Sequence, residues 1–252
     1  MKSNRLPLLA AATLLTLTAW GQSPMSGATP PGWDTSFTKL FGEIKTFSAK
    51  ADLRMLDQSG QETMTLGGMS FALLDEKVRV EVDLSQMKSA QMSPAAVASL
   101  KQMGMDRMVS LVIPDKKVVT LIYPGLQATV EMPLPDSETA AALKDAKPEI
   151  TKLGNETIDG QPCIKNKVMM TDAKGQKREV LVWNASNMKE FPLQVRFAEG
   201  DNMLEMRFKQ VKLEKPEAKQ FEPPTGYTKY ADFTQFMGAA MQKMMTDGPA
   251  KE

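Results

Sequence analysis

Methionine is the residue of this chain with the most unusual chemistry, with 20 copies among 252 residues. Its thioether sulfur is a soft ligand that suits Cu(I). The same side chain is flexible and polarisable, so it also fills irregular apolar surfaces. Because neither a histidine nor a nearby cysteine accompanies the methionines, we favour apolar packing and keep methionine-based Cu(I) binding as an alternative. The clustered methionines are Met87, Met92, Met103, Met105 and Met108 in one segment, and Met241, Met244 and Met245 in another.

Catalytic chemistry has few candidate residues in this sequence. Histidine, the commonest general base and a frequent metal ligand, is absent. GxSxG, CxxC and phosphate-cradling glycine motifs are absent as well. The acidic residues are spread along predicted strand edges and turns, with no cluster. We therefore predict no catalytic residue, no metal site and no cofactor, and we expect a binding protein rather than an enzyme.

Charge and cysteine content narrow the class further. The net charge is +1, from 31 basic and 30 acidic residues, so nothing favours binding to nucleic acid. Cys163 is the only cysteine, so the chain has no internal disulfide. We expect Cys163 to be a small buried hydrophobic residue rather than a reactive thiol.

The N-terminus has the three parts of a secretory signal peptide. Lys2 and Arg5 are positively charged, residues 6–19 are mostly apolar, and Ala19-Trp20-Gly21 supplies small residues at the usual cleavage spacing. The apolar stretch is shorter than the ~20 residues that a membrane-spanning helix needs. We expect cleavage near Gly21 and a monomeric protein in the periplasm. The predicted segments are a signal peptide over 1–21, a flexible leader over 22–33, one domain over 34–230 and a C-terminal helix with its tail over 231–252.

Alternation of apolar and polar residues predicts strands through most of the chain. It is cleanest over 77–83, where the valines at 78, 80 and 82 share one face. In the last strand the apolar phase changes after Phe208, which predicts a bulge near Lys209 or Gln210. The predicted strands are 49–55, 62–66, 69–73, 77–83, 109–113, 117–123, 127–132, 161–171, 178–183, 193–197 and 203–213.

Short helices are predicted before, within and after these strands. Apolar residues at helical spacing over 37–44, with Asp34 or Thr35 as the cap, indicate an opening amphipathic helix. Ser93-Pro94 is a good helix start and Gly104 a good stop. Residues 137–146 are alanine-rich, and 233–244 carry an apolar stripe. About eleven short strands with these helices predict an α+β protein with a single curled antiparallel sheet, a half-open β-barrel covered by short helices.

Taken in order, several motifs resemble the LolA-like superfamily of periplasmic lipoprotein carriers. They are the opening segment 40–47, Gly67-Gly68, the hairpin over 113–124 and the Phe-x-x-Pro-x-Gly stretch at 221–226. Residues 153–163, followed by Trp183 and Phe191-Pro192-Leu193, are similar to uncharacterised exported families of the same superfamily. The resemblance covers most of the chain after the signal peptide. It implies a half-open barrel whose apolar concavity, lidded by helices, holds acyl chains or an apolar partner.

The predicted ligand site is the apolar face of the first strands. A wide curled sheet does not fill its concavity with its own side chains, so a helix or a ligand occupies it. The predicted function is therefore non-enzymatic binding of an acyl chain, lipid or lipoprotein, with docking of another envelope protein at a strand edge as an alternative. The predicted groove residues are Ala49, Ala51, Leu53, Met55, Met64, Leu66, Phe71, Val78, Val80 and Val82. The predicted lid residues are Val97, Leu100 and Met103, with 232–245 as a second lid segment.

Overall fold

Alternating burial along the strands builds a sheet with one apolar face, as the sequence predicts. The computed structural model describes residues 37–89, 92–134, 148–171 and 177–247. In β3 (Lys77–Asp83), for example, Val78, Val80 and Val82 are buried while the residues between them are half exposed. Successive side chains of a strand point to opposite faces. We call the face that carries the hydrophobic core the inner face and the other the outer face.

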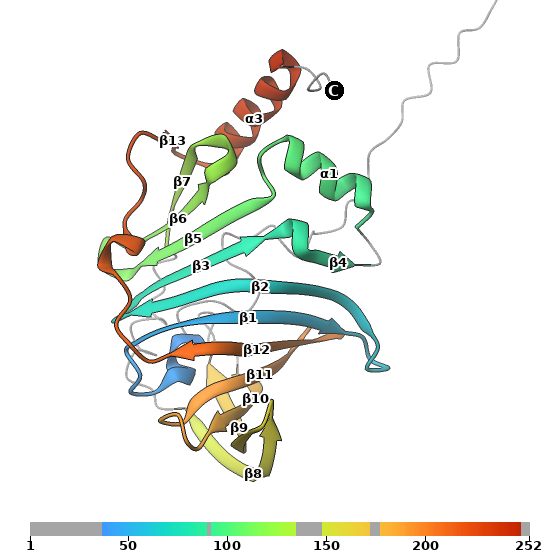
Figure 1. Ribbon diagram of the computed structural model, residues 1–252, viewed down its shortest axis with the longest axis vertical. Coiled ribbons are helices and arrows are strands. Elements are labelled where there is room, and N and C mark those ends of the chain that lie inside the picture. Colours follow the sequence, from blue (N-terminus) through green and yellow to red (C-terminus); the bar gives the residue numbers. More distant parts are fainter. Residues whose placement is uncertain (1–36, 90–91, 135–147, 172–176, 248–252) are drawn as a thin grey trace, which may run out of the picture.

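Within the described residues, thirteen strands form one curled sheet (Figure 1). The strands are β1 (Thr46–Leu56), β2 (Glu62–Leu74), β3, β4 (Met87–Ser89), β5 (Arg107–Ile113), β6 (Val118–Tyr123), β7 (Ala128–Pro133), β8 (Glu149–Ile158), β9 (Gln161–Thr171), β10 (Lys177–Ala185), β11 (Phe191–Glu199), β12 (Asn202–Lys212) and β13 (Thr228–Tyr230). Their order is β13-β7-β6-β5-β3-β2-β1-β12-β11-β10-β9-β8, with β4 paired to β2. The pairings are antiparallel except for the parallel pair of β13 with β7. The sheet is open, because its two end strands, β13 and β8, do not pair with each other.

Helical elements join and cover the strands. They are η1 (Phe37–Phe41), η2 (Leu84–Gln86), α1 (Pro94–Gln102), η3 (Pro114–Lys116), η4 (Pro124–Leu126), η5 (Ala218–Phe221) and α3 (Phe233–Asp247). Helix α1 starts as predicted, because the Ser93 hydroxyl accepts a hydrogen bond from the Ala96 amide at 3.2 Å. Helix α3 is also confirmed. None of the described helices is both long and apolar enough to cross a membrane. The predicted signal peptide, leader, first cap and helix over 137–146 lie outside the described residues.

Several predicted element boundaries were wrong. The opening helix is a single 3₁₀ turn that ends at Phe41, because Gly42 takes a left-handed backbone conformation with φ +56°. The strands predicted over 62–66 and 69–73 form one strand, β2, with a bulge at Gly68 (φ +68°), whose amide donates to Asp52 Oδ1 at 3.0 Å. Strands β4, β8 and β13 were not predicted; with two predicted strands merged into β2, the count among the described residues is thirteen rather than eleven.

The predicted bulge in the last strand is present. The register between β1 and β12 shifts between Ser48 and Lys50, and Gln210 has φ +51°. Leu204, Met206 and Phe208 are buried before the bulge, and Val211 packs against the same core after it. One extra residue therefore keeps both groups on the inner face.

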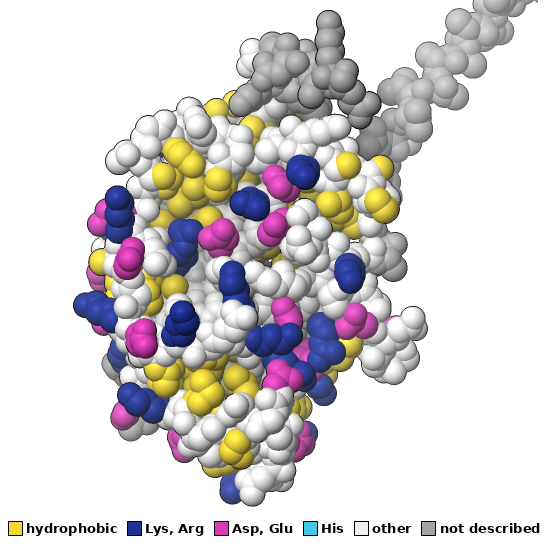
Figure 2. Space-filling model, in the orientation of Figure 1, with side chains coloured by type: hydrophobic (Ala, Val, Ile, Leu, Met, Phe, Trp, Pro, Cys, Tyr) yellow, Lys and Arg dark blue, Asp and Glu magenta, His cyan; other side chains and the backbone are white. Residues whose placement is uncertain are grey.

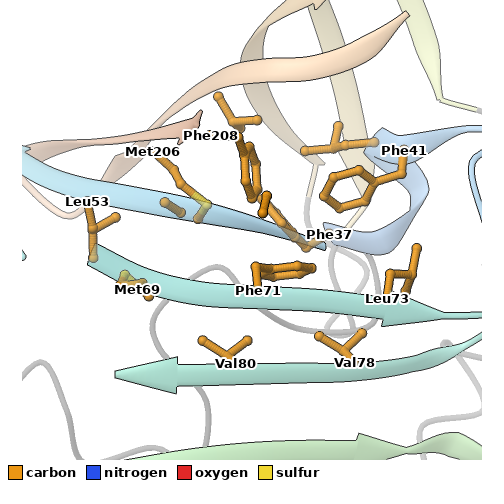
Figure 3. Packing of buried hydrophobic residues seen from close by; sticks show 14 of the residues in the cluster. Phe37, Phe41, Leu53, Met69, Phe71, Leu73, Val78, Val80, Met206 and Phe208 are labelled. Carbon is orange, nitrogen blue, oxygen red and sulfur yellow. The ribbon is translucent and has the colours of Figure 1, made fainter. Parts of the chain in front are cut away.

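Six phenylalanine rings fill the centre of the inner face, and Figure 3 labels Phe37, Phe41, Phe71 and Phe208 among them. Phe37 and Phe41 come from η1 and lie over Phe71 of β2, with ring centroids 6.3 and 5.9 Å away. Phe47 stacks on Phe71 at 5.4 Å with the ring planes 2° apart. The other two rings are Phe191 of β11 and Phe208 of β12. All six side chains are buried, so η1 acts as a plug on this part of the sheet.

The outer face carries an ion network around one buried carboxylate. Charged side chains gather over the middle of this face in Figure 2. Glu205 of β12 is only 1% exposed and pairs with Arg54 of β1 and Arg196 of β11. Arg207 lies 3.8 Å from Glu205 Oε1, and Gln194 donates to Glu205 Oε2 at 3.2 Å. This network links the neighbouring strands β11, β12 and β1 through their side chains on the outer face.

Candidate functional site

The ten predicted groove residues lie together on the inner face of β1, β2 and β3. Eight are buried in the main hydrophobic core, while Met55 and Met64, which are direct cross-strand partners, are half buried. The η1 plug covers Phe71 and its neighbours. The sequence thus grouped these side chains on one face, and ligand contact with them stays a prediction. The eight buried residues are Ala49, Ala51, Leu53, Leu66, Phe71, Val78, Val80 and Val82.

The two predicted lid segments differ in how they pack. Val97, Leu100 and Met103 are half buried, and no residue of α1 is fully buried. Helix α3 packs more closely, because Phe236 is 1% exposed and stacks on Tyr123 of β6 with ring centroids 4.5 Å apart. Burial raises the pKa of Tyr123 to about 12. Helix α3 therefore covers the β6 end of the inner face.

An open cleft lies on the same face at the other end of the sheet. It has a volume of about 1120 Å³ and separates η1 and the following segment from strands β8, β9 and β10. This volume is slightly above the usual range for small-molecule pockets, ~300–1000 Å³. The plug thus fills the centre of the concavity, and among the described residues none covers the side of the β8–β10 arm that lines the cleft.

Strand alternation supplies the wall formed by the arm. Val168 of β9 pairs with Val180 of β10 and with Ile150 of β8, so these side chains share one face. Val182 continues the same face along β10 and lines the cleft with Val168 and Ile150. Ile150 is 63% exposed, although an isoleucine on the inner face of a β-rich protein is normally buried. Ile150 is therefore the side chain of this wall that is open to water, whereas Val168 and Val182 beside it are 4% and 1% exposed.

The opposite wall comes from η1 and the turn after it. Gly42 reverses the chain, and its amide donates to the Lys39 carbonyl at 3.1 Å. Leu40 and Phe41 of η1, which are buried, line the cleft together with Ile44 after the turn, which is half buried. The turn at Gly42 therefore continues the wall that η1 begins.

The polar lining of the cleft is mostly basic. The cations are Lys39, Lys45, Lys152 and Lys189, and the carboxylates are Glu43 and Glu190. Asn166 and Asn184 bond to each other at 2.9 Å, and Asn184 also donates to the Glu190 carbonyl at 2.8 Å. Since the two amides satisfy part of each other's hydrogen-bonding capacity, they extend the wall at little desolvation cost. The excess of lysine favours a ligand with a negative end.

The arrangement suits binding by burial of hydrocarbon. Moving an acyl chain of about 14 methylenes from water to an apolar wall gains roughly 11 kcal/mol. Loss of translational and rotational freedom costs at least ~4 kcal/mol. The remaining ~7 kcal/mol corresponds to a dissociation constant on the order of 10 µM. Over the described residues, no three His, Cys, Asp or Glu side chains lie close enough together to hold a metal ion.

Sequence reasoning missed the cleft itself. Its two walls come from residues near 40 and from residues after 148, and β8 was not predicted as a strand. The one available signal was Ile150 in an otherwise polar stretch. The structure also places Trp183 on the outer face, where its indole Nε1 donates to Glu156 at 2.7 Å and Lys165 Nζ lies 5.0 Å from its ring centroid.

Comparisons with known proteins give matches at the level of solved structures. No protein-family model and no curated protein sequence matches the chain. The lipoprotein LppX from Mycobacterium tuberculosis is 10% identical over 70% of this chain and 91% of its own, with a TM-score of 0.38. A LolA superfamily protein from Nitrosomonas europaea is 11% identical over 75% of this chain and 94% of its own, with a TM-score of 0.33. LprF from Mycobacterium bovis is 11% identical over 70% and 89%, with a TM-score of 0.35.

The second of these structures is from the LolA superfamily, which the sequence resembles. The superpositions are loose, however, as the TM-scores show.

Proposed function

We propose that this protein is a non-enzymatic carrier in the periplasm that holds the acyl chain of a lipid or lipoprotein in the cleft between η1 and the β8–β10 arm. The observation that carries the proposal is Ile150, an apolar side chain on the inner face that is 63% exposed within a cleft of about 1120 Å³. Buried neighbours at Val168 and Val182 extend the same wall. Such a wall binds hydrocarbon without specific polar contacts, which suits reversible loading and release.

The lysines around the cleft add a preference to this proposal. Lys45, Lys152 and Lys189 line the cleft and are exposed, so they can attract a carboxylate or phosphate head group while the acyl chain lies on the apolar wall. Lys45 Nζ has one long contact, 3.4 Å to the Gly42 carbonyl, so its ammonium group retains donors for a ligand. We expect fatty acids to bind more tightly than the matching fatty alcohols.

The test is a titration of delipidated protein with the fluorescent fatty acid cis-parinaric acid. Ile150→Gln should weaken binding about ten-fold, because it replaces an apolar contact worth ~1.5 kcal/mol by a polar group. Leu153→Gln is the matched control, since Leu153 lies in the same strand, is 51% exposed and does not line the cleft. It should change the affinity less than about two-fold.

Two results would overturn the proposal. The first is a wild-type protein that shows no saturable binding of the fatty acid. The second is an equal effect of both substitutions, which would mean that the ligand rests on exposed apolar side chains of β8 in general rather than in the cleft.

A further inference from the structure

A second groove lies on the outer face, on the opposite side of the sheet from the cleft. Its volume is about 600 Å³. Its floor includes Ser48 and Lys50 of β1 and Ser70 of β2, which alternate with the buried inner-face residues Ala49 and Phe71. Its wall is formed by the segment that follows β12, residues 213–227 including η5, which we call the strap. Figure 1 shows the strap, in orange to red, running past the ends of β1, β2 and β3 towards β6 and β13.

The strap is held against the sheet at points on each side of the groove. Phe221 is 4% exposed and packs with Ala72 and Leu74 of β2. The Gln220 carbonyl accepts a hydrogen bond from Arg79 Nη1 at 3.3 Å. Further along, Tyr227 packs against a small outer-face core formed by β5 and β6. The groove is therefore bounded by fixed elements rather than by a loosely attached loop.

One end of the groove is cationic. Lys212 of β12, Lys50 of β1 and Lys219 of the strap line it, and the groove lining also includes Glu222 of the strap. Lys50 donates to Ser70 Oγ at 2.7 Å, and across the described part of the chain no carboxylate lies within ion-pair distance of these three lysines. In the middle of the groove, Arg79 is paired with Glu81 at 3.0 Å. Three ammonium groups at one end thus remain available to an anion.

The other end of the groove is apolar. Val109 of β5, Ile122 of β6 and Pro124 line it together with Tyr227. Val109 and Ile122 are buried cross-strand partners, whereas Tyr227 is half buried. Hydrophobic side chains also gather over this part of the face in Figure 2. From β1 to β5 there are three strand spacings, or about 14 Å, so the polarity of the groove changes over the length of a small molecule.

We propose that this groove binds a small organic anion in which a phosphate or carboxylate group is joined to a flat apolar body. The lysine end holds the anion through charge-assisted hydrogen bonds. The ring of Tyr227 and the Pro124 ring cover the apolar body, a use to which amphipathic aromatic side chains are well suited. The site is separate from the acyl-chain cleft and does not depend on it.

The test uses 4-methylumbelliferyl phosphate and the full-length protein. Binding is measured by the fluorescence of the ligand and by changes in the NMR chemical shifts of the protein's amides. It should bind at least about ten-fold more tightly than inorganic phosphate or 4-methylumbelliferone, because only the ester uses both ends of the groove. The double substitution Lys50→Gln, Lys212→Gln should weaken it about ten-fold. Both side chains are exposed, so the melting temperature should stay unchanged. Lys152→Gln, in the cleft on the inner face, is the control and should have no effect.

Three results would overturn this proposal. Equal affinities for the ester and for inorganic phosphate would reduce the site to surface charge. An unchanged affinity in the double variant would place the ester elsewhere. Binding to vesicles of phosphatidylglycerol without binding of the free ester would assign the lysines to a lipid head group. Failure of fatty-acid binding in the cleft would leave the proposal for the groove untouched.

Discussion

Replacing Glu205 by glutamine tests how much the outer-face ion network stabilises the fold. The substitution keeps the size of the side chain and removes its charge, leaving Arg54, Arg196 and Arg207 around a neutral amide. Breaking a fully buried ion pair costs ~3–5 kcal/mol. The three arginine side chains are 38%, 34% and 27% exposed, so water partly solvates them after the substitution. We therefore expect a smaller loss, about 2–3 kcal/mol.

The pH dependence of this loss has a defined direction. Burial raises the pKa of Glu205, but hydrogen bonds and charges from Arg196 and Arg54 outweigh it, so the pKa lies below its ordinary value of 4.5. A carboxyl whose pKa is lower in the folded state stabilises the fold above its unfolded pKa, and this contribution disappears as the pH falls through the folded pKa. The difference between wild type and Glu205→Gln should therefore be constant above about pH 5 and shrink below pH 4.5.

Urea unfolding followed by circular dichroism at several pH values measures both effects. Glu179→Gln is the matched control, because Glu179 is 55% exposed and only 3.8 Å from Lys167, and it should cost less than about 0.5 kcal/mol. A loss in Glu205→Gln no larger than that of the control, or a loss that stays constant down to pH 3, would refute the reasoning.

The remaining predictions concern the plug and a close backbone contact. Phe41→Ala should lower the free energy of unfolding in urea by ~3–5 kcal/mol, because Phe41 is 3% exposed and contacts five other rings. Phe233→Ala is the control, since Phe233 is 42% exposed, and it should cost less than about 1 kcal/mol. Equal losses in the two variants would contradict the account of the plug. Gly125→Ala should cost ~1–3 kcal/mol in melting experiments, since its Cβ would lie 2.6 Å from the Gly104 carbonyl oxygen at the end of α1. Gly154→Ala, with open space around it, is the control, and a neutral Gly125→Ala would show that α1 shifts freely.

The sheet was largely predictable because burial follows a period of two. In β1, β3 and β12 the apolar residues alternate, and the change of phase after Phe208 predicted a bulge near Lys209 or Gln210, where Gln210 has a left-handed backbone conformation. Helix α1 was predictable for a different reason. Its limits are encoded locally, by Ser93 and Pro94 at the start and Gly104 after the end.

Strand β8 could not be found in this way, because an edge strand has no burial pattern to reveal it. Nine of its ten residues are exposed or half exposed, so polar residues occupy both faces. The cleft was beyond reach for a related reason. It forms between η1 and an arm more than a hundred residues away in the sequence, and local residue spacing does not predict such a long-range arrangement. The filling of the central concavity by Phe37 and Phe41 likewise depends on the turn at Gly42. Glycine permits the left-handed backbone conformation of this turn, but a glycine in the sequence does not by itself predict it.

The most direct test of the central claim is a methyl-labelled NMR experiment on the delipidated protein with one equivalent of palmitic acid. If an acyl chain lies on the arm, intermolecular NOEs should connect its methylenes to the methyl groups of Ile150, Ile164, Val168 and Val182, which line the cleft. NOEs confined to other apolar sites, such as Leu153 or the Tyr227 end of the outer-face groove, would contradict the claim, as would an absence of any NOE to the bound acid.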